Sequence, residues 1–428
     1  MIKSGGYGGG ASPQAKHVVK QNEGQIAGLP ARQAALKLLD AVLRQCQTLD
    51  NAAANASRGI AAHEDRALAL AIASEVLRHL TDLDALIDTA TTNRLPDDAK
   101  ARMVLRIALV QTLILKTPPH AAIATALPMV LGGPRRLVHG VFGTLMRQGV
   151  LLPEVPTLPP EVAARWAVWG DDVLADAAQA LAEPPPLDVT LRDPEHDGGL
   201  VGEQLAPGHR RLPRGTAITA LPGYDDGAWW VQNLAASVPA RLLGAGHGRT
   251  ALDLCAAPGG KTMQLAAQGW AVTAVDNHAG RSTRLRDNLA RTNLAAEIVT
   301  GDIMTWAPAA PVDAILLDAP CTATGTFARH PDVLHRIGAN DIAALCALQH
   351  RLLARAMTWL KPDGRLIYAT CSLEREEGER VIEASGFAID PIAAGELPAG
   401  LSPDARGQVR ILPKRGLDGF FVARLKQG

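Results

Sequence analysis

The chain of 428 residues has few cysteines, few aromatic residues and no long apolar run. Its five cysteines include no C-x-x-C pair and its twelve histidines show no ligand spacing, so neither a disulfide framework nor a metal site is expected. The longest apolar stretch, residues 107–115, is interrupted by Gln111 and Thr112 and is too short to cross a membrane. The N-terminal segment has no apolar run that could act as a signal peptide, which favours a cytoplasmic protein without a membrane partner.

The chain has no net charge, but its charged residues are unevenly distributed. The formal net charge is zero, but residues 1–150 hold 17 Lys and Arg against 11 Asp and Glu, a net charge of +6. The remaining residues hold 26 against 32, a net charge of −6. A basic first third is compatible with a nucleic-acid partner or with a merely solvated surface, and charge alone does not decide between them.

The pattern along the chain predicts a multidomain protein. Residues 1–30 are rich in glycine and polar residues, which is typical of a disordered tail. Residues 31–150 predict an all-α helical bundle, because apolar residues recur at helical spacing. The first predicted helix shows this stripe clearly: Ala35, Leu38, Leu39, Val42 and Leu43. A proline-rich linker follows at residues 151–160.

Residues 161–235 predict a small α+β module. A short helical pair is followed by a triple-proline stop and by two strand-like pieces, LDVTLRD and TAITAL. The segment GHRRLPRG in this module either contacts phosphate groups or forms a solvated loop, and both readings stay open. Its charged residues are His209, Arg210, Arg211 and Arg214.

Residues 236–428 predict an α/β domain with a Rossmann-like, doubly wound and mostly parallel sheet, because apolar strands alternate with helices. Ligands bind such sheets at the carboxyl ends of the strands. The five strand ends expected here all carry polar or reactive residues. They are the loop after Leu254, Asp276, Asp302, Asp318 with Cys321, and Cys371.

The loop after the first of these strands lies within ALDLCAAPGGKTMQLAA, residues 251–267, and approaches a P-loop. Gly260, Lys261 and Thr262 match the second half of G-x-x-x-x-G-K-[ST]. Cys255 replaces the first glycine, so a P-loop NTPase remains only an alternative, and a dehydrogenase is disfavoured because G-x-G-x-x-G is absent. Asp276 follows the second strand, where an acidic residue can accept both ribose hydroxyls, which suits a nucleoside without a pyrophosphate such as S-adenosylmethionine.

Six motifs occur in order from about residue 229 to the end: DLCAAPGGKT, VDNHAGRSTRLRDNL, GD, LLDAPCTATGTFARHPD, YATCSLEREEGERVI and DGFFVARL. Together they resemble the RsmB/Sun group of the Nol/Nop/Sun family, which are cytosine-C5 RNA methyltransferases. The helical region 31–150 is similar to the NusB-like RNA-binding domain of this group. The resemblance implies S-adenosyl-L-methionine as the methyl donor and 16S rRNA as the RNA partner, with residues 161–235 as a further RNA-binding module and a monomeric enzyme without a metal.

The resemblance also implies roles for the two strand-end cysteines, which spacing alone does not separate. The family uses the cysteine of its Thr-Cys-Ser motif as the nucleophile, here Cys371. The cysteine of its Pro-Cys motif, here Cys321, is associated with product release. Asp318 is expected to contact the target cytosine and to lie close to the donor.

The donor is expected to bind at three strand ends. Asp276 would contact its ribose and Asp302 its adenine, while the loop would surround its methionine end. That loop consists of Cys255, Ala256, Ala257, Pro258, Gly259, Gly260 and Lys261, of which Lys261 could alternatively meet RNA phosphate.

Some features leave the function open. A non-catalytic RNA-binding or ribosome assembly factor with a retained donor pocket is a second hypothesis. Arg329 and His330 in RHPD are expected to face RNA. Two positions depart from the family pattern and put the RNA fit in doubt, because His335 stands where the family often has an aromatic residue and Gly378 where it often has Asn.

Overall fold

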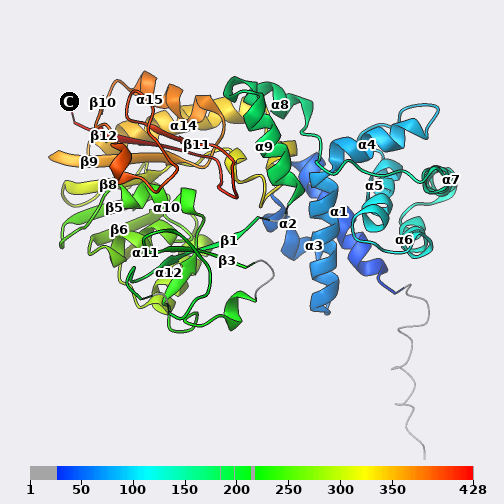
Figure 1. Cartoon of the computed structure of the whole chain (residues 1–428), viewed down its shortest axis with the longest axis horizontal. Helices are drawn as coiled ribbons and strands as arrows, with labels where there is room; N and C mark the ends of the chain where they lie inside the picture. The colour runs from blue at the N-terminus through cyan, green and yellow to red at the C-terminus, as the bar shows by residue number, and fades with distance from the viewer. Residues whose placement is uncertain (1–26, 184, 197, 214–216, 428) are drawn as a thin grey trace, which may run out of the picture.

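The computed structural model describes residues 27–183, 185–196, 198–213 and 217–427, so nearly all of the predicted disordered tail lies outside the described residues. A helical body and an α/β body lie side by side, with α8 (Pro160–Trp166) and α9 (Asp171–Ala182) between them (Figure 1). In the described residues no helix is both long and apolar enough to span a membrane.

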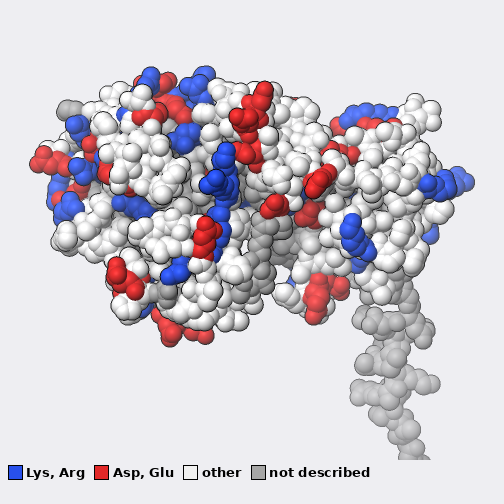
Figure 2. Space-filling model, viewed as in Figure 1, with Lys and Arg blue, Asp and Glu red and all other residues white. Residues whose placement is uncertain are grey.

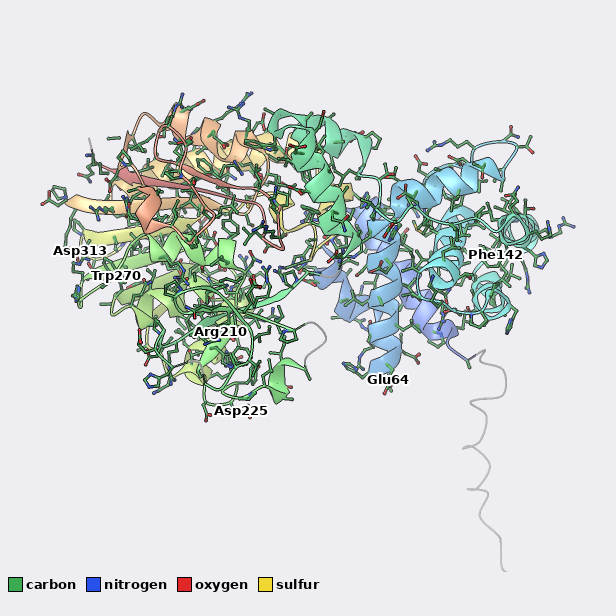
Figure 3. The ribbon with its side chains drawn as sticks, viewed as in Figure 1. Glu64, Phe142, Arg210, Asp225, Trp270 and Asp313 are labelled. Atoms are coloured by element: carbon green, nitrogen blue, oxygen red, sulfur yellow. The ribbon has the colours of Figure 1, made fainter. Side chains whose placement is uncertain are left out.

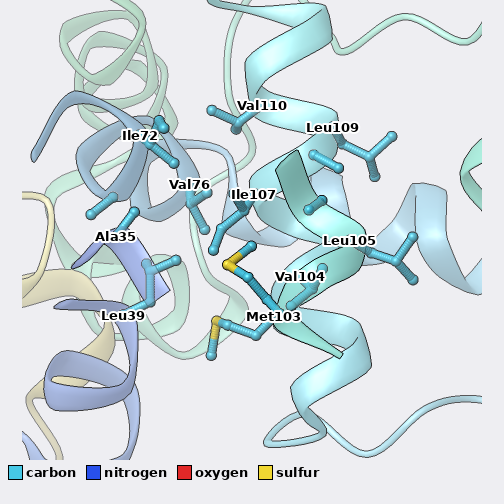
Figure 4. Packing of buried hydrophobic residues seen from close by; sticks show 14 of the residues in the cluster. Ala35, Leu39, Ile72, Val76, Met103, Val104, Leu105, Ile107, Leu109 and Val110 are labelled. Atoms are coloured by element: carbon cyan, nitrogen blue, oxygen red, sulfur yellow. The ribbon is translucent and has the colours of Figure 1, made fainter. Parts of the chain in front are cut away.

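The N-terminal body is the predicted all-α bundle, and one helix lies at its centre. In α5 every residue from Ala101 to Gln111 is buried, because neighbouring helices cover it on all sides. Figure 4 shows its Val104 and Ile107 among apolar side chains that include Ile72 and Val76 of α3. The helices are α1 (Leu29–Gln45), α2 (Leu49–Ala56), α3 (His63–Arg78), α4 (Leu80–Thr89), α5 (Lys100–Leu113), α6 (Pro119–Ala126) and α7 (Gly132–Gln148), with a 3-10 turn η1 (Leu127–Met129).

The helices α8 (Pro160–Trp166) and α9 (Asp171–Ala182), joined by η2 (Ala167–Trp169), pack against the C-terminal domain around Phe327 and Leu373. A small antiparallel sheet follows them, in the order β2-β3-β1-β4, with an apolar core of its own. Its strands are β1 (Leu187–Leu191), β2 (Glu203–Ala206), β3 (His209–Leu212) and β4 (Trp229–Val231). The domain borders predicted at residues 150, 160 and 235 stay predictions.

Two expectations for this module are wrong. The piece TAITAL forms no strand in its described part but a 3-10 turn, η3 (Ile218–Ala220). Residues 208–213 of GHRRLPRG do not form the solvated loop that was one of the two readings, because they contribute β3, and contact with phosphate groups stays a prediction. His209 is completely buried, Arg211 forms an ion pair with Asp188 at 2.7 Å, and Arg214 lies outside the described residues.

The C-terminal domain has the predicted α/β fold, and its sheet is mixed. Its strand order is β10-β12-β9-β8-β5-β6-β7, with β11 paired to β12. The five predicted strands are parallel, whereas β12 runs antiparallel to β9. The strands are β5 (Thr250–Leu254), β6 (Ala271–Asp276), β7 (Glu297–Thr300), β8 (Val312–Asp318), β9 (Leu360–Thr370), β10 (Ala388–Ile389), β11 (Val409–Ile411) and β12 (Phe420–Lys426).

Helices cover both faces of this sheet, as expected for a doubly wound fold. One face packs on α10 and α11, the other on α14 and α15. The helices are α10 (Leu234–Arg241), α11 (Gly260–Ala267), α12 (Ala279–Thr292), α13 (Val333–Arg336), α14 (Ala339–Met357) and α15 (Glu379–Ser385), with the turns η4 (Thr324–Thr326), η5 (Arg375–Glu377) and η6 (Ala394–Glu396).

The sheet is oriented so that its functional edge faces the helical body. Asp313, near the start of β8, and Trp270, just before β6, lie at the edge of the molecule that is remote from α1–α7 (Figure 3). The carboxyl ends of these strands therefore point towards the N-terminal bundle.

Candidate active site

Two thiols meet at neighbouring strand ends. The strands β8 and β9 are parallel and adjacent, with Asp318 opposite Ala369, and each is followed by a half-buried cysteine. The Sγ atoms of Cys321 and Cys371 are 3.5 Å apart. The hydrogen bond to Cys371, together with burial, raises the pKa of the Cys321 thiol. Cys321 is therefore protonated at neutral pH in the free protein.

A partly buried ion pair lies at the same edge of the sheet. Lys261 Nζ is 2.7 Å from Asp318 Oδ2 and lies over the ring of Phe420 at 5.3 Å from its centroid. Burial acts to lower the pKa of Lys261, but the Asp318 carboxylate outweighs it and the net shift is upward. Lys261 is therefore a charged ammonium that fixes one oxygen of Asp318.

The loop after β5 brings its backbone close to neighbouring elements. Gly259 has φ +104°, and a Cβ there would lie 3.0 Å from Leu285 Cγ, so the position favours glycine. Asn288 of α12 donates to the Pro258 carbonyl at 2.9 Å. Cys255 has no sign of reactivity, because burial raises the pKa of its thiol well above the usual range.

The two predicted nucleoside contacts lie at the next two strand ends. Asp276 is 2% exposed and accepts the Ala257 N–H at 3.1 Å and the His278 N–H at 3.0 Å. Its other neighbour is the guanidinium of Arg281, at 3.1 Å. Asp302 is exposed and accepts the Met304 N–H at 2.8 Å. A preformed buried carboxylate beside a glycine turn, with an exposed carboxylate next to it, fits an adenosine group.

Sequence reasoning missed a buried acid behind the loop. Asp253 of β5 accepts the Thr262 hydroxyl at 2.6 Å and so connects the strand to the first turn of α11. Its Oδ1 atom is buried and has no hydrogen-bond partner in the described part of the chain. Burial raises its pKa to about 7. The signal was its place in DLCAAPGG, one residue before the strand ends.

Sequence reasoning also missed Glu377 and Arg410. Glu377 accepts hydrogen bonds from residues next to both cysteines, and its position inside EREEGERVI was the available signal. Arg410 donates to the Ser372 carbonyl and pairs with Glu379 at 2.7 Å. Nothing in its sequence context indicates this role.

The residues expected to contact RNA interact with other residues of the chain. Arg329 pairs with Asp418 at 3.2 Å and donates to the Pro186 carbonyl. His330 lies 3.8 Å from Asp50 of α2. On the face shown in Figure 2, basic and acidic side chains are interspersed, so no patch of one sign dominates it.

The two departures from the family pattern have structural roles here. His335 donates through Nε2 to the Leu77 carbonyl of α3 at 2.7 Å and so connects the two bodies. At Gly378 a Cβ would lie 2.5 Å from the Arg410 guanidinium and 2.8 Å from Phe421 Cγ. The absent side chain therefore leaves room for Arg410 to reach Ser372.

Comparisons with known proteins point to one family. The family model described as 16S rRNA methyltransferase RsmB/F matches residues 240–426, and that of the NusB family matches residues 29–130. Ribosomal RNA small subunit methyltransferase B of Xylella fastidiosa is 33% identical, over 93% of this chain and 98% of the relative. The protein of that name from Xanthomonas campestris is 32% identical, over 94% and 98%.

Solved structures share the fold. The crystal structure titled PH0851 superimposes with a TM-score of 0.70 at 22% identity and covers 94% of this chain and 99% of its own. NSun6 from Pyrococcus horikoshii, solved with SFG, gives a TM-score of 0.54 at 19% identity, over 63% and 98%. These likenesses confirm the predicted fold class.

The predicted family is confirmed by the relatives, and the P-loop NTPase and the non-catalytic factor are set aside with it. The methyl donor is S-adenosyl-L-methionine, as predicted. With an N-terminal NusB domain and a C-terminal α/β catalytic domain, the chain belongs to the RsmB/F family of 16S rRNA methyltransferases and is an S-adenosylmethionine-dependent RNA methyltransferase.

Proposed function

We propose that the protein methylates carbon 5 of a cytosine in 16S rRNA through a covalent adduct between Cys371 and carbon 6 of the base. The observation that carries this proposal is the pair of thiols 3.5 Å apart, next to an ion pair of Lys261 and Asp318. The relatives named ribosomal RNA small subunit methyltransferase B support the choice of RNA.

The chemistry explains why thiols are needed. Carbon 5 of cytosine is a weak nucleophile until a thiolate adds to carbon 6. The new S–C6 bond pushes electrons to carbon 5, which then takes a methyl group. Removal of the proton at carbon 5 forms the C5–C6 double bond again and expels the Cys371 thiolate. The donor, when bound, supplies the methyl group as a sulfonium substituent.

In this scheme Cys371 attacks and Cys321 assists the elimination. In the free protein Cys321 is kept protonated chiefly by its hydrogen bond to Cys371. Once the Cys371 sulfur is bonded to carbon 6 it carries no negative charge, so a main cause of the raised pKa of Cys321 is gone. Cys321 then takes part in removing the C5 proton at the stage where a base is required.

Asp318 is placed to hold the edge of the base. One of its oxygens is occupied by Lys261, which leaves the other to accept a hydrogen bond from the exocyclic amine of cytosine. A uracil offers a carbonyl at that position instead of an amine, so the carboxylate would select against it. The target base must also leave its stack to reach the two thiols.

For the donor, we propose that the loop Cys255–Lys261 surrounds the methionine end, with Asp276 at the ribose and Asp302 at the adenine. The backbone approach at Gly259 and the buried, preformed carboxylate of Asp276 support these positions. We further propose a monomeric, cytoplasmic enzyme without a metal. In the described residues no three potential metal ligands gather.

The function is tested by bisulfite mapping of 16S rRNA from cells with and without this protein. One cytosine should lose its protection when the protein is absent. Transfer of labelled methyl to purified 16S rRNA and to small subunits then shows which form is the substrate. Methyl transfer to carbon 5 of uracil, or none to 16S rRNA in either form, would overturn the proposal.

A further inference from the structure

A completely buried carboxylate lies behind the two thiols. Glu377 is 0% exposed and ends the turn η5 between β9 and α15. Its Oε1 accepts the Thr322 N–H at 2.9 Å, and its Oε2 accepts the hydroxyl groups of Thr322 and Ser372 at 2.5 Å each. One side chain thus connects two loops that are 50 residues apart in sequence.

The connected residues stand directly beside the cysteines. Thr322 follows Cys321, and Ser372 follows Cys371. Gln349 of α14 donates through Nε2 both to Glu377 Oε1 at 3.0 Å and to the Pro320 carbonyl at 2.8 Å. The residue before Cys321 and the residue after each cysteine are therefore connected to the same carboxylate.

Anchoring α15 to the sheet would not require this arrangement. Taking a carboxylate out of water costs several kcal/mol unless hydrogen bonds compensate for it. The Tyr368 hydroxyl already holds this turn through the Glu377 carbonyl, at 2.8 Å. The side chain adds nothing to that link, and all the donors it accepts belong to the cysteine loops or to Gln349.

We propose that Glu377 is a positioning residue that sets the separation of Cys321 and Cys371 for their two successive roles. Through Ser372 it orients the thiol that attacks carbon 6, and through Thr322 it orients the thiol that assists elimination. This inference rests on the proposed function, because it assigns one step to each loop.

The first test is Glu377→Gln, which keeps the size of the side chain but leaves only one oxygen acceptor. A displacement of about 1 Å at reacting atoms can cost about 100-fold in rate, so kcat should fall by a factor of this order while KM for S-adenosylmethionine stays within about twofold. The matched control is Glu376→Gln. Its carboxylate is 45% exposed and lies 3.8 Å from Arg380, so its kcat should remain that of the wild type.

Two single-hydroxyl variants separate positioning from a loss of stability. Ser372→Ala should slow formation of the covalent adduct, measured in the Cys321→Ala background. Thr322→Val, in an otherwise native chain, should leave adduct formation unchanged and slow its release, so that adduct accumulates. These variants also serve if Glu377→Gln does not fold.

The inference is overturned if Glu377→Gln keeps the kcat of its control. It is equally overturned if Ser372→Ala and Thr322→Val lower only the fraction of folded protein, or slow the same step. Failure of the proposed function looks different, because the wild-type protein and the Glu376→Gln control would then transfer no methyl group to 16S rRNA, and Cys321→Ala would form no adduct.

Discussion

Substitution of Asp253 by Asn should change how the stability of the catalytic domain depends on pH. Burial raises the pKa of this carboxyl group from 3.8 to about 7. Between these two values the folded protein binds a proton that the unfolded chain has lost. Stability therefore decreases as the pH rises through this window, and the decrease is complete above about pH 7.

The magnitude follows from the two pKa values. At about 1.4 kcal/mol per pKa unit, ionising Asp253 in the fold costs about 4 kcal/mol more than in the unfolded chain. Of this, about 3 kcal/mol is lost between pH 5 and pH 8. Asn keeps an oxygen that can accept the Thr262 hydroxyl, and it does not titrate. The stability of the variant should therefore not show this decrease between pH 5 and pH 8.

Thermal unfolding of the donor-free protein at pH 5 and pH 8 measures the effect. For a domain of about 190 residues, 1 kcal/mol shifts Tm by about 2–4 °C. The difference in Tm between the variant and the wild type should therefore be about 6–12 °C more favourable to the variant at pH 8 than at pH 5. Asp313→Asn is the control. An ion pair with Lys361 lowers the pKa of Asp313 to about 2, so its titration lies outside the tested range. If Asp253→Asn changed Tm by the same amount at pH 5 and at pH 8, the reasoning would be refuted.

Two further predictions concern packing around the site. In Gly325→Ala the new Cβ would lie 2.0 Å from the Gly419 carbonyl oxygen, and Gly325 N–H donates to the Cys371 carbonyl. The variant should lose about 1–3 kcal/mol of stability and about 100-fold in kcat, unlike Gly395→Ala, where a Cβ meets nothing. Trp166→Phe removes a bond to the buried Glu374 carboxylate and should cost about 1.5–3 kcal/mol in urea unfolding. Val168→Ala at an exposed position should cost nothing measurable, and an equal loss in both variants would contradict this account.

The sequence was most informative where local pattern decides structure. Apolar strands that end in a polar or reactive residue, as at Asp318 and Thr370, are visible in the sequence because parallel strands are buried on both faces. The resemblance then supplied the chemistry of the residues that follow. The stripe of the first predicted helix was equally clear, since Ala35, Leu38, Leu39 and Val42 are all buried in α1.

Local pattern failed where distant packing decides. The alternation in TAITAL imitates a strand, but Ile218 and Leu221 pack onto the small sheet from a 3-10 turn. The antiparallel direction of β12 depends on the route of the chain and is not encoded in FFVARL itself. The contact of His335 with Leu77 joins residues 258 positions apart, and no single-sequence pattern reports such a pair.

The nearness of the site to the N-terminal bundle bears on RNA binding. The carboxyl ends of the strands point towards α1–α7 (Figure 3), and Arg78 of α3 donates to the Leu181 and Ala328 carbonyls of the parts beyond. His335 contacts α3 at the same junction, through the Leu77 carbonyl. We therefore propose that RNA which reaches the two thiols passes close to the NusB domain, and the excess of basic residues in the N-terminal part of the chain supports this proposal.

The most direct measurement of the central claim is denaturing electrophoresis of the protein after incubation with 16S rRNA and S-adenosylmethionine. Cys321→Ala should accumulate a covalent protein–RNA complex, because the sulfur of residue 371 still adds to the base while elimination fails. Cys371→Ala should form no complex and transfer no methyl group. A stable complex with Cys371→Ala, and none with Cys321→Ala, would contradict the assignment of the attacking sulfur.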